Sequence, residues 1–194
     1  MSVCIIPARG GSQRIPGKNT RDFRGVPMIH RAIETARKTM LFTRHEIWVS
    51  TDSLEVADIA KDGGALVIMR PRELALNQVG TQEVMRHAAK ILGLHRPDSA
   101  CCLYPCSPLL NPADLLLGHD LLTPAHTYTM SVGTDPLCDA GNFYWGWAGS
   151  FMADVPLIGP DTVMVPIDKD RVCDINTPED WLRAETLFDN LKEK

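Results

Sequence analysis

Three basic residues and a pair of glycines are gathered in one short segment near the start of the chain. Arg9, Arg14 and Lys18 surround Gly10-Gly11, and the segment directly follows the apolar run Val3–Pro7. Glycine lets backbone N–H groups turn toward an anion, because no Cβ stands in the way. Arginine offers a planar fork for phosphate oxygens, and lysine offers a compact charge. These like charges are unfavourable on one tight loop unless an anion neutralises them, so we predict a triphosphate site.

Two well-known phosphate loops do not fit this segment. The spacing from Gly11 to Gly17 is one residue too long for a Walker A loop, and Asn19 stands where that motif has a hydroxyl residue. The Gly-x-Gly-x-x-Gly pattern of dinucleotide-binding folds is absent from the sequence. The plain alternative to a phosphate loop is a basic, solvated glycine turn.

Apolar runs and helical patterns alternate along the chain and indicate the elements that position this loop. Strands are expected at Val3–Pro7, Glu46–Ser50, Ala65–Met69, Ser99–Tyr104, Thr127–Val132 and Thr162–Pro166. Helices are expected at Met28–Thr39, Leu54–Lys61, Thr81–Leu92 and Asp114–Leu122, with a last helix capped by Thr177 and Asp180. This alternation favours an α/β fold with a mostly parallel sheet and helices on both faces.

Parallel sheets of this kind hold their sites at the carboxyl ends of the strands. We therefore expect the loops that begin at Pro7, Thr51, Arg70 and Pro105 to meet at one edge. After Val132 the pattern changes, and two stretches that flank three aromatic residues are typical of turns: Asp139–Asn142 and Gly146–Gly149.

Composition sets the broad class. The 194 residues are enough for one well-buried domain, which we expect to span residues 1–194, and 44% hydrophobic with 23% charged residues is ordinary for a soluble globular protein. The net charge of −4 argues against nucleic acid or an anionic membrane as a partner. Met1–Pro7 lacks the basic start of a signal peptide, so we expect a cytoplasmic protein. The six cysteines contain no Cys-x-x-Cys pair, which favours buried structural thiols over a zinc site.

With these motifs the sequence resembles the acylneuraminate cytidylyltransferases, which make CMP-sugars from CTP and nine-carbon acidic sugars. The likeness is carried by the phosphate loop and by five further stretches: Val49–Asp52, Arg70–Ala75, Tyr104–Leu109, Asp139–Gly146 and Asp174–Trp181. The Asp-Ala-Gly…Phe-Tyr-Trp-Gly stretch is most similar to the pseudaminic acid branch. The resemblance implies a Rossmann-like sheet and an attack of a sugar hydroxyl on the α-phosphate of CTP, with release of pyrophosphate.

The resemblance also implies roles for single residues. Arg9 and Lys18 would be catalytic, because they would grip the triphosphate and stabilise charge on the transferred phosphate. The other nucleotide-binding positions would be Ala8, Gly10, Gly11, Ser12, Arg14, Asn19, Arg70 and Thr81. The sugar-binding positions would be Ser107, Asp139, Asn142 and Tyr144. For Arg70 and Thr81 the alternatives, a strand-end turn and a helix N-cap, stay open.

The chain departs from the family in its metal motif and in its sugar region. Asn176 replaces the second carboxylate of Asp-x-Asp-Thr-Pro, so we expect Asp174 and Asn176 to hold Mg²⁺ weakly or to act only as turn residues. A long segment before the Asp-Ala-Gly motif, which in the family reaches a dimer partner and brings cations to the sugar, is reduced to Gly133–Cys138 without a Lys or Arg. Tyr104 and Cys106 replace a polar pair usual in the sialic acid branch.

Two functions follow from this pattern. One is an active cytidylyltransferase, possible as a homodimer, with an altered sugar pocket. The other is a non-catalytic nucleotide-binding relative that serves as a partner or regulatory subunit. The intact Arg9–Lys18 loop favours the enzyme, and the shortened segment favours the relative.

Overall fold

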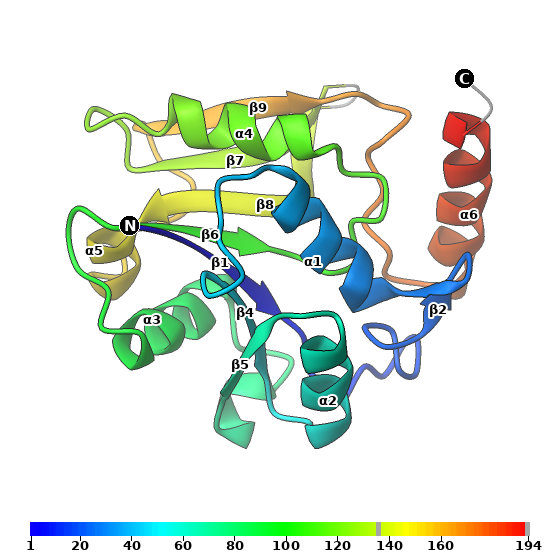
Figure 1. Ribbon diagram of the computed structural model, residues 1–194. Coiled ribbons are helices and arrows are strands. Elements are labelled where there is room, and N and C mark those ends of the chain that lie inside the picture. The colour runs from blue at the N-terminus through cyan, green and yellow to red at the C-terminus, as the bar shows by residue number, and fades with distance from the viewer. Residues whose placement is uncertain (135–136, 193–194) are drawn as a thin grey trace.

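The computed structural model describes residues 1–134 and 137–192. Its centre is a seven-stranded sheet whose strands are β1 Ser2–Pro7, β4 Ile47–Thr51, β5 Leu66–Met69, β6 Ser99–Leu103, β7 Tyr128–Thr134, β8 Leu137–Trp147 and β9 Thr162–Ile167. Their order is β5-β4-β1-β6-β8-β7-β9 (Figure 1). In the described part of this seven-stranded sheet, β8 is the one strand that runs opposite to the others, and the predicted, mostly parallel sheet is therefore confirmed.

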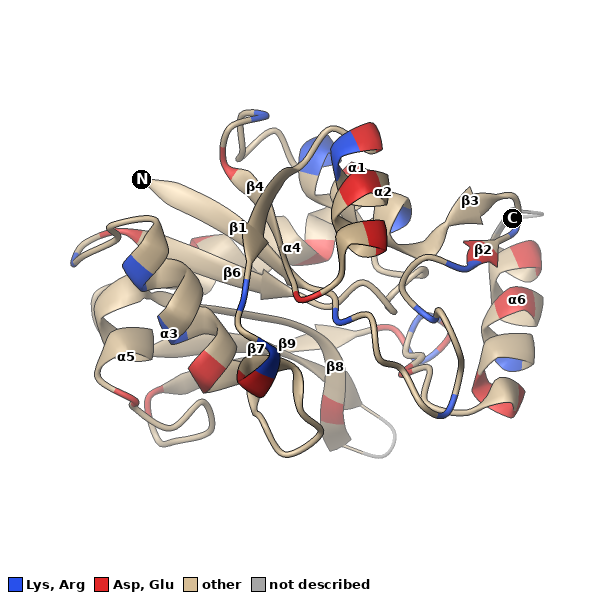
Figure 2. Ribbon diagram, turned by 90° about the horizontal axis from the view of Figure 1, so that it is seen from below, with Lys and Arg blue, Asp and Glu red and all other residues tan. Residues whose placement is uncertain are grey.

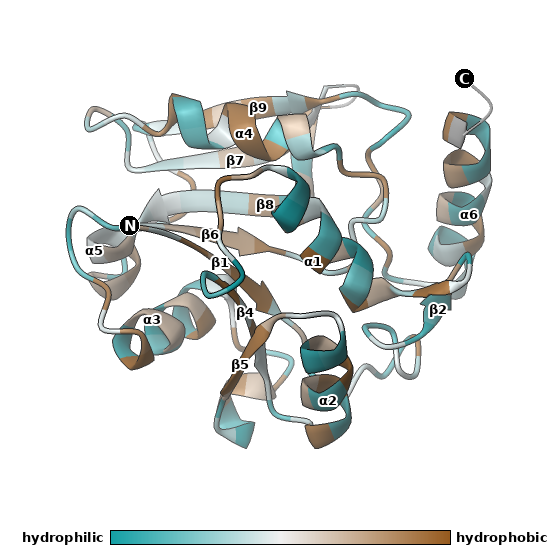
Figure 3. Ribbon diagram, in the orientation of Figure 1, coloured by the Kyte–Doolittle hydropathy of each residue, from teal (hydrophilic) through white to brown (hydrophobic). Residues whose placement is uncertain are grey.

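The helices cover both faces of this sheet, as predicted. They are α1 Met28–Lys38, α2 Leu54–Asp62, α3 Thr81–Ile91, α4 Pro112–Leu121, α5 Ala148–Met152 and α6 Pro178–Lys192, with a 3₁₀ turn η1 at Arg72–Ala75. Alternate side chains of β1 point to opposite faces. Cys4 and Ile6 pack with α1, α2 and α4, whereas Val3 and Ile5 pack with α3 and α5. The central strands β1, β4 and β6 are accordingly mostly apolar (Figure 3), as expected of strands buried on both sides.

The antiparallel strand β8 was not expected, since its residues Asp139–Asn142 and Gly146 are typical of turns. The structure places them inside the strand instead. The register between β7 and β8 shifts between Met130 and Val132, and Gly141 has a φ of +63°, so the turn-like residues form an irregularity within the strand. Gly146 is needed for packing, because a Cβ there would lie 2.3 Å from the Tyr128 ring. Residues 135–136 of the shortened segment lie outside the described residues.

The last helix, α6, packs away from the sheet, against the small hairpin of β2 Asp22–Phe23 and β3 Val26–Pro27 (Figure 1). Its predicted cap is confirmed, since Asp180 Oδ2 accepts hydrogen bonds from the backbone N–H groups of Asn176 and Thr177. Phe23 is fully buried between the rings of Trp181 and Phe188, each 5.5 Å away in edge-on geometry. This aromatic cluster fixes the stretch that leads into α6.

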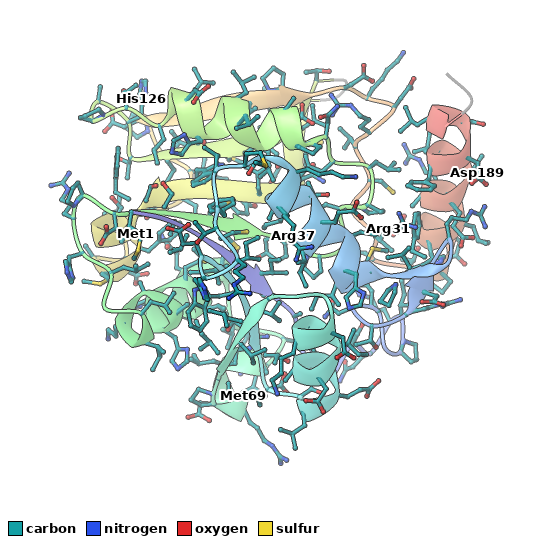
Figure 4. All side chains as sticks on the ribbon, in the orientation of Figure 1. Met1, Arg31, Arg37, Met69, His126 and Asp189 are labelled. Atoms are coloured by element: carbon teal, nitrogen blue, oxygen red, sulfur yellow. The ribbon has the colours of Figure 1, made fainter. Side chains whose placement is uncertain are left out.

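Charged contacts support the same junction. The Arg31 guanidinium of α1 lies 4.6 Å from the Phe188 ring centroid, and Arg24 donates two hydrogen bonds to Asp189. Figure 4 labels Arg31 on α1 and Asp189 on α6. Among the described residues no helix is long and apolar enough to cross a membrane. The cysteines are free, and five of them are buried while Cys138 is exposed.

The packing of α6 predicts a large loss of stability for Trp181→Ala. Trp181 is 3% exposed, and truncation removes its contact with Phe23, so the free energy of unfolding should fall by about 3–5 kcal/mol. Leu182, the next residue, is 64% exposed, and Leu182→Ala should change the free energy of unfolding by under about 0.5 kcal/mol. Chemical denaturation of both variants measures this, and equal midpoints for Trp181→Ala and the parent chain would contradict the assignment of this junction.

Candidate active site

A cavity of about 500 Å³ opens at the carboxyl ends of β1, β5 and β6, and its walls bring together residues from both ends of the chain. The predicted meeting of the loops after Pro7, Arg70 and Pro105 is thus confirmed. The loop after Thr51 supports them from behind, because Asp52 accepts a hydrogen bond from the backbone of Gly10. Predicted site residues that line the cavity are Arg9, Arg14, Lys18, Asn19, Arg70, Thr81, Asp139, Tyr144, Asp174 and Asn176.

Asn19 closes the phosphate loop on itself. It is 6% exposed, and its side-chain amide donates to the carbonyl oxygen of Arg9 at 2.9 Å, which ties the two ends of the loop together. Gly10 is required at the other side, because a Cβ there would lie 2.6 Å from the Cβ of Ser53. The first glycine therefore serves close packing of the loop, whereas a Cβ on Gly11 would meet nothing within 4 Å.

Six of the predicted residues do not line the cavity. Gly10, Gly11 and Ser12 lie on the loop outside it, and Ala8 is fully buried beneath it with its N–H bonded to Ser50. Ser107 and Asn142 are buried behind the wall, and their side-chain oxygens have no hydrogen-bond partner among the described residues. In this structure they support the wall from behind.

Lys18 and Arg14 join the phosphate loop to the carboxyl-terminal stretch before α6. Lys18 Nζ donates to the backbone carbonyl of Ile175 at 2.6 Å, and Arg14 Nη2 donates to Asn176 Oδ1 at 2.9 Å. Asn176 Nδ2 in turn donates to Asp174 Oδ2 at 2.5 Å, so the side chains of Asp174 and Asn176 lie on the same side, as an extended stretch predicts. Figure 2 shows Lys and Arg along the loops that lie between the strand ends and α6.

Arg70 is a buried cation at the cavity wall. It is 7% exposed, and its Nε has no hydrogen-bond partner in the part of the chain that the structure describes. Burial lowers the pKa of the Arg70 guanidinium; the Asp52 carboxylate opposes this change, and the nearby Arg9 guanidinium adds to it. A buried, incompletely satisfied cation next to a cavity is typical of an anion-binding site.

A polar wall of two tyrosines faces these cations. The hydroxyls of Thr81 and Tyr104 lie 2.6 Å apart, so Thr81, the first residue of α3, directs its side chain to the wall. Tyr144 donates a hydrogen bond to Asp139, whose other oxygen accepts from the Gly141 N–H at 2.9 Å. Burial raises the pKa of both phenols well above the ordinary value, and the Asp139 carboxylate adds to this for Tyr144. Both tyrosines therefore stay neutral donors.

A profile of the family described as cytidylyltransferase matches residues 3–140 of the chain, which include β1, the phosphate loop and the strands up to β7.

The chain belongs to the cytidylyltransferase family. It is therefore a nucleotidyltransferase by family, and the predicted resemblance is confirmed.

One curated relative matches almost from end to end. The pseudaminic acid cytidylyltransferase of Campylobacter jejuni is 28% identical over an alignment of 224 positions, which covers 96% of this chain and 96% of that relative. Since the alignment is longer than the chain, that relative carries residues with no counterpart here.

Two solved structures share the fold of this cytidylyltransferase. A CMP:2-keto-3-deoxy-manno-octonic acid synthetase complexed with CTP has a TM-score of 0.77 at 17% identity, with 98% of this chain and 99% of that chain covered. Rv0371c from Mycobacterium tuberculosis H37Rv, in complex with manganese, has a TM-score of 0.66 at 14% identity, with 95% and 97% covered. At these sequence identities the similarity establishes a shared fold alone.

Asp174 and Asn176 of this cytidylyltransferase provide a limited donor set for a metal ion. One is a carboxylate and the other a neutral amide whose oxygen already accepts from Arg14. No group of three or more His, Cys, Asp or Glu among the described residues is placed to hold a metal. Mg²⁺ commonly takes one or two protein carboxylates and completes its shell with water and substrate phosphates. The residues therefore fit a divalent cation that arrives with the nucleotide.

Sequence reasoning missed Asn77 and Gln13, and left Tyr104 and Cys106 without a positive role, although Asn77, Tyr104 and Cys106 line the cavity. Asn77 lies in a segment without helical or strand period, where the residue type alone gives no signal. Tyr104 and Cys106 flank Pro105 at the end of β6, so their position at a strand end could have identified them. Burial raises the pKa of the Cys106 thiol to about 11 against the opposing effect of Lys18, so it remains a neutral thiol.

The burial of Arg70 predicts that replacing it affects protein stability and CTP binding in opposite directions. Arg70→Met removes a desolvated charge and keeps an apolar side chain of similar length, so the free protein should be as stable or about 1 kcal/mol more stable, while CTP binding is lost. Thermal melts with and without CTP measure both effects. Arg72→Met, at an exposed residue of the adjacent turn, should leave both unchanged. A strong loss of stability in Arg70→Met would show that Arg70 is a structural residue.

Proposed function

We propose that this cytidylyltransferase transfers CMP from CTP to a sialic-acid-like nonulosonic acid, such as pseudaminic acid, and releases pyrophosphate. The observation that carries the proposal is a cavity lined by three cations of the phosphate loop, by the buried Arg70 and by two carboxylates. The pseudaminic acid cytidylyltransferase of Campylobacter jejuni supports the sugar class by its match along the whole chain. We place the activity in the cytoplasm, where CTP is available.

In this proposal the residues of the phosphate loop have different roles in binding the triphosphate. Arg9 and Lys18 hold the phosphates and stabilise the charge that builds on the transferred phosphorus as the sugar hydroxyl attacks. Arg14 binds the same chain of phosphates from the side of Asn176. Asn19 acts by keeping the loop closed, since its side-chain amide donates to the carbonyl oxygen of Arg9.

Arg70 and Thr81 read the nucleoside at the other wall, and the sugar occupies the side of Asp139 and Tyr144. The Asp139 carboxylate is oriented by the Tyr144 hydroxyl and the Gly141 N–H, so it can accept a hydrogen bond from a sugar hydroxyl. The segment Gly133–Cys138 carries no Lys or Arg, so we include in the proposal a homodimer in which a second copy supplies cations for the sugar carboxylate.

Mg²⁺ is the cation we assign to the reaction, held by Asp174 with Asn176 at its side. When bound, it would neutralise phosphate charge and orient the departing pyrophosphate. The amide of Asn176 contributes less charge than a carboxylate, so phosphate oxygens must complete the site.

The decisive experiment measures pyrophosphate release from CTP and Mg²⁺ against a panel of nine-carbon acidic sugars, with sugar omitted as the control. Release that depends on one of these acids supports the proposal. Tight CTP binding with no release for any sugar would instead favour the non-catalytic nucleotide-binding relative. Lys18→Ala should lower the rate by at least about 100-fold while the protein still unfolds cooperatively, because a loop lysine contributes charge to the transition state.

The metal assignment predicts that Mg²⁺ binds negligibly without nucleotide and that Asn176→Asp strengthens it by roughly tenfold, because the substitution adds a carboxylate beside Asp174. Calorimetric titration of Mg²⁺ into both proteins, with and without CTP, measures this. Identical curves for the two proteins would mean that Asn176 is a turn residue and would remove the main support for Asp174 as a metal ligand.

A further inference from the structure

The segment between η1 and α3 is tied across the cavity to the phosphate loop by one side chain. Asn77 Oδ1 accepts a hydrogen bond from Arg9 Nη1 at 2.5 Å, and Asn77 Nδ2 donates to Gln13 Oε1 at 3.2 Å. Arg9 Nη1 also approaches the carbonyl oxygen of Ala75 at 3.4 Å. Arg9, Ala75 and Asn77 all line the cavity, so this bridge lies at the proposed triphosphate end.

The two contacts fix which way the Asn77 amide faces. Gln13 Oε1 is an acceptor, so it holds the NH₂ group of Asn77 and leaves the oxygen directed toward Arg9. Because the amide is neutral, it satisfies a donor of the Arg9 guanidinium without cancelling its charge. An acidic side chain at this position would make the same hydrogen bond but would also neutralise the cation.

A tether is needed here because Arg9 has a cationic neighbour. The Arg9 guanidinium is close enough to lower the pKa of the buried Arg70. Like charges at such a distance repel, and an untethered Arg9 side chain could swing into solvent away from the cavity. The contacts with Asn77 and Ala75 hold the Arg9 side chain at the cavity that Arg70 also lines.

We propose that Asn77 is a positioning residue that presents a fully charged Arg9 to the triphosphate, with Gln13 setting the orientation of its amide. This inference rests on the proposed function, since Arg9 is assigned there to the phosphates. It goes further by giving a residue outside the phosphate loop control over how strongly the polyphosphate binds.

The test separates the phosphate end of the site from the nucleoside end. Tripolyphosphate, cytidine and CTP are titrated calorimetrically into the full chain and its variants. Asn77→Ala should weaken tripolyphosphate and CTP by about tenfold, because a hydrogen bond to a charged group is lost, and should change cytidine affinity by less than about twofold. Gln13→Ala should weaken the polyphosphates in the same direction but less.

Asn77→Asp separates positioning by a neutral group from a merely structural hydrogen bond. The carboxylate keeps an acceptor of the same shape, so a structural role predicts unchanged or tighter binding. Our proposal predicts a loss at least as large as that of Asn77→Ala, because the new charge neutralises Arg9 and repels the phosphates. Glu73→Ala, at an exposed residue of the adjacent turn, is the matched control and should bind like the parent chain.

The outcomes distinguish the role of Asn77 from the proposed function of the protein. If the parent chain binds tripolyphosphate and CTP while Asn77→Asp and Asn77→Ala bind them equally well, the role of Asn77 is overturned and the proposed function stands. If the parent chain binds neither ligand, the proposed function fails and the role of Asn77 fails with it. Melting curves of every variant accompany the titrations, and Gln13→Ala keeps the test open if an Asn77 variant does not fold.

Discussion

The structure depends on holding four cations around one cavity without cancelling their charge. Lys18 donates to a backbone carbonyl, Arg9 to a carbonyl and an amide, and Arg14 to an amide. Away from the cavity two arginines are paired with carboxylates instead, Arg24 with Asp189 and Arg171 with Asp114. Neutral oxygens orient a guanidinium or an ammonium and leave its field intact, which is what binding of a polyphosphate needs. The cost is repulsion among the cations, which the rest of the fold must withstand.

The fold withstands the repulsion among these cations by joining both ends of the chain. The phosphate loop is closed on itself by Asn19, and it is closed against the carboxyl-terminal stretch by the contacts of Lys18 and Arg14. That stretch is held in turn by Ile175, which is fully buried with the aromatic residues that dock α6. A helix that contributes no residue to the cavity therefore determines where two of its cations stand. This explains why α6 packs on the small hairpin near the loop and not on the sheet.

The sequence predicted the parts that local physics decides. The alternation of strands and helices, the loop after β1 and the cap of α6 each have a short-range signal, and each is found in the structure. The strand β8 was missed because Asp139–Asn142 carries turn residues that the sheet absorbs as an irregularity next to the cavity. Ser107 and Asn142 follow from family resemblance but lie behind the wall. Asn77 had no signal, because its role arises from a contact with Arg9 across 68 residues of chain.

The same reasoning gives Asn176 a physical meaning beyond the loss of a carboxylate. An aspartate there would pair with Arg14 and cancel its charge at the mouth of the cavity. The amide keeps the hydrogen bond from Arg14 to its oxygen and returns a second hydrogen bond to Asp174, so one side chain orients a cation and an anion without changing the charge of either. Asn77 likewise accepts a hydrogen bond from Arg9, and its NH₂ group donates to the neutral amide of Gln13. The chain thus uses a neutral amide to orient each of the two arginines of the phosphate loop. At position 176 the amide leaves the positive charge of Arg14 in place, where a second metal-binding carboxylate would have cancelled it.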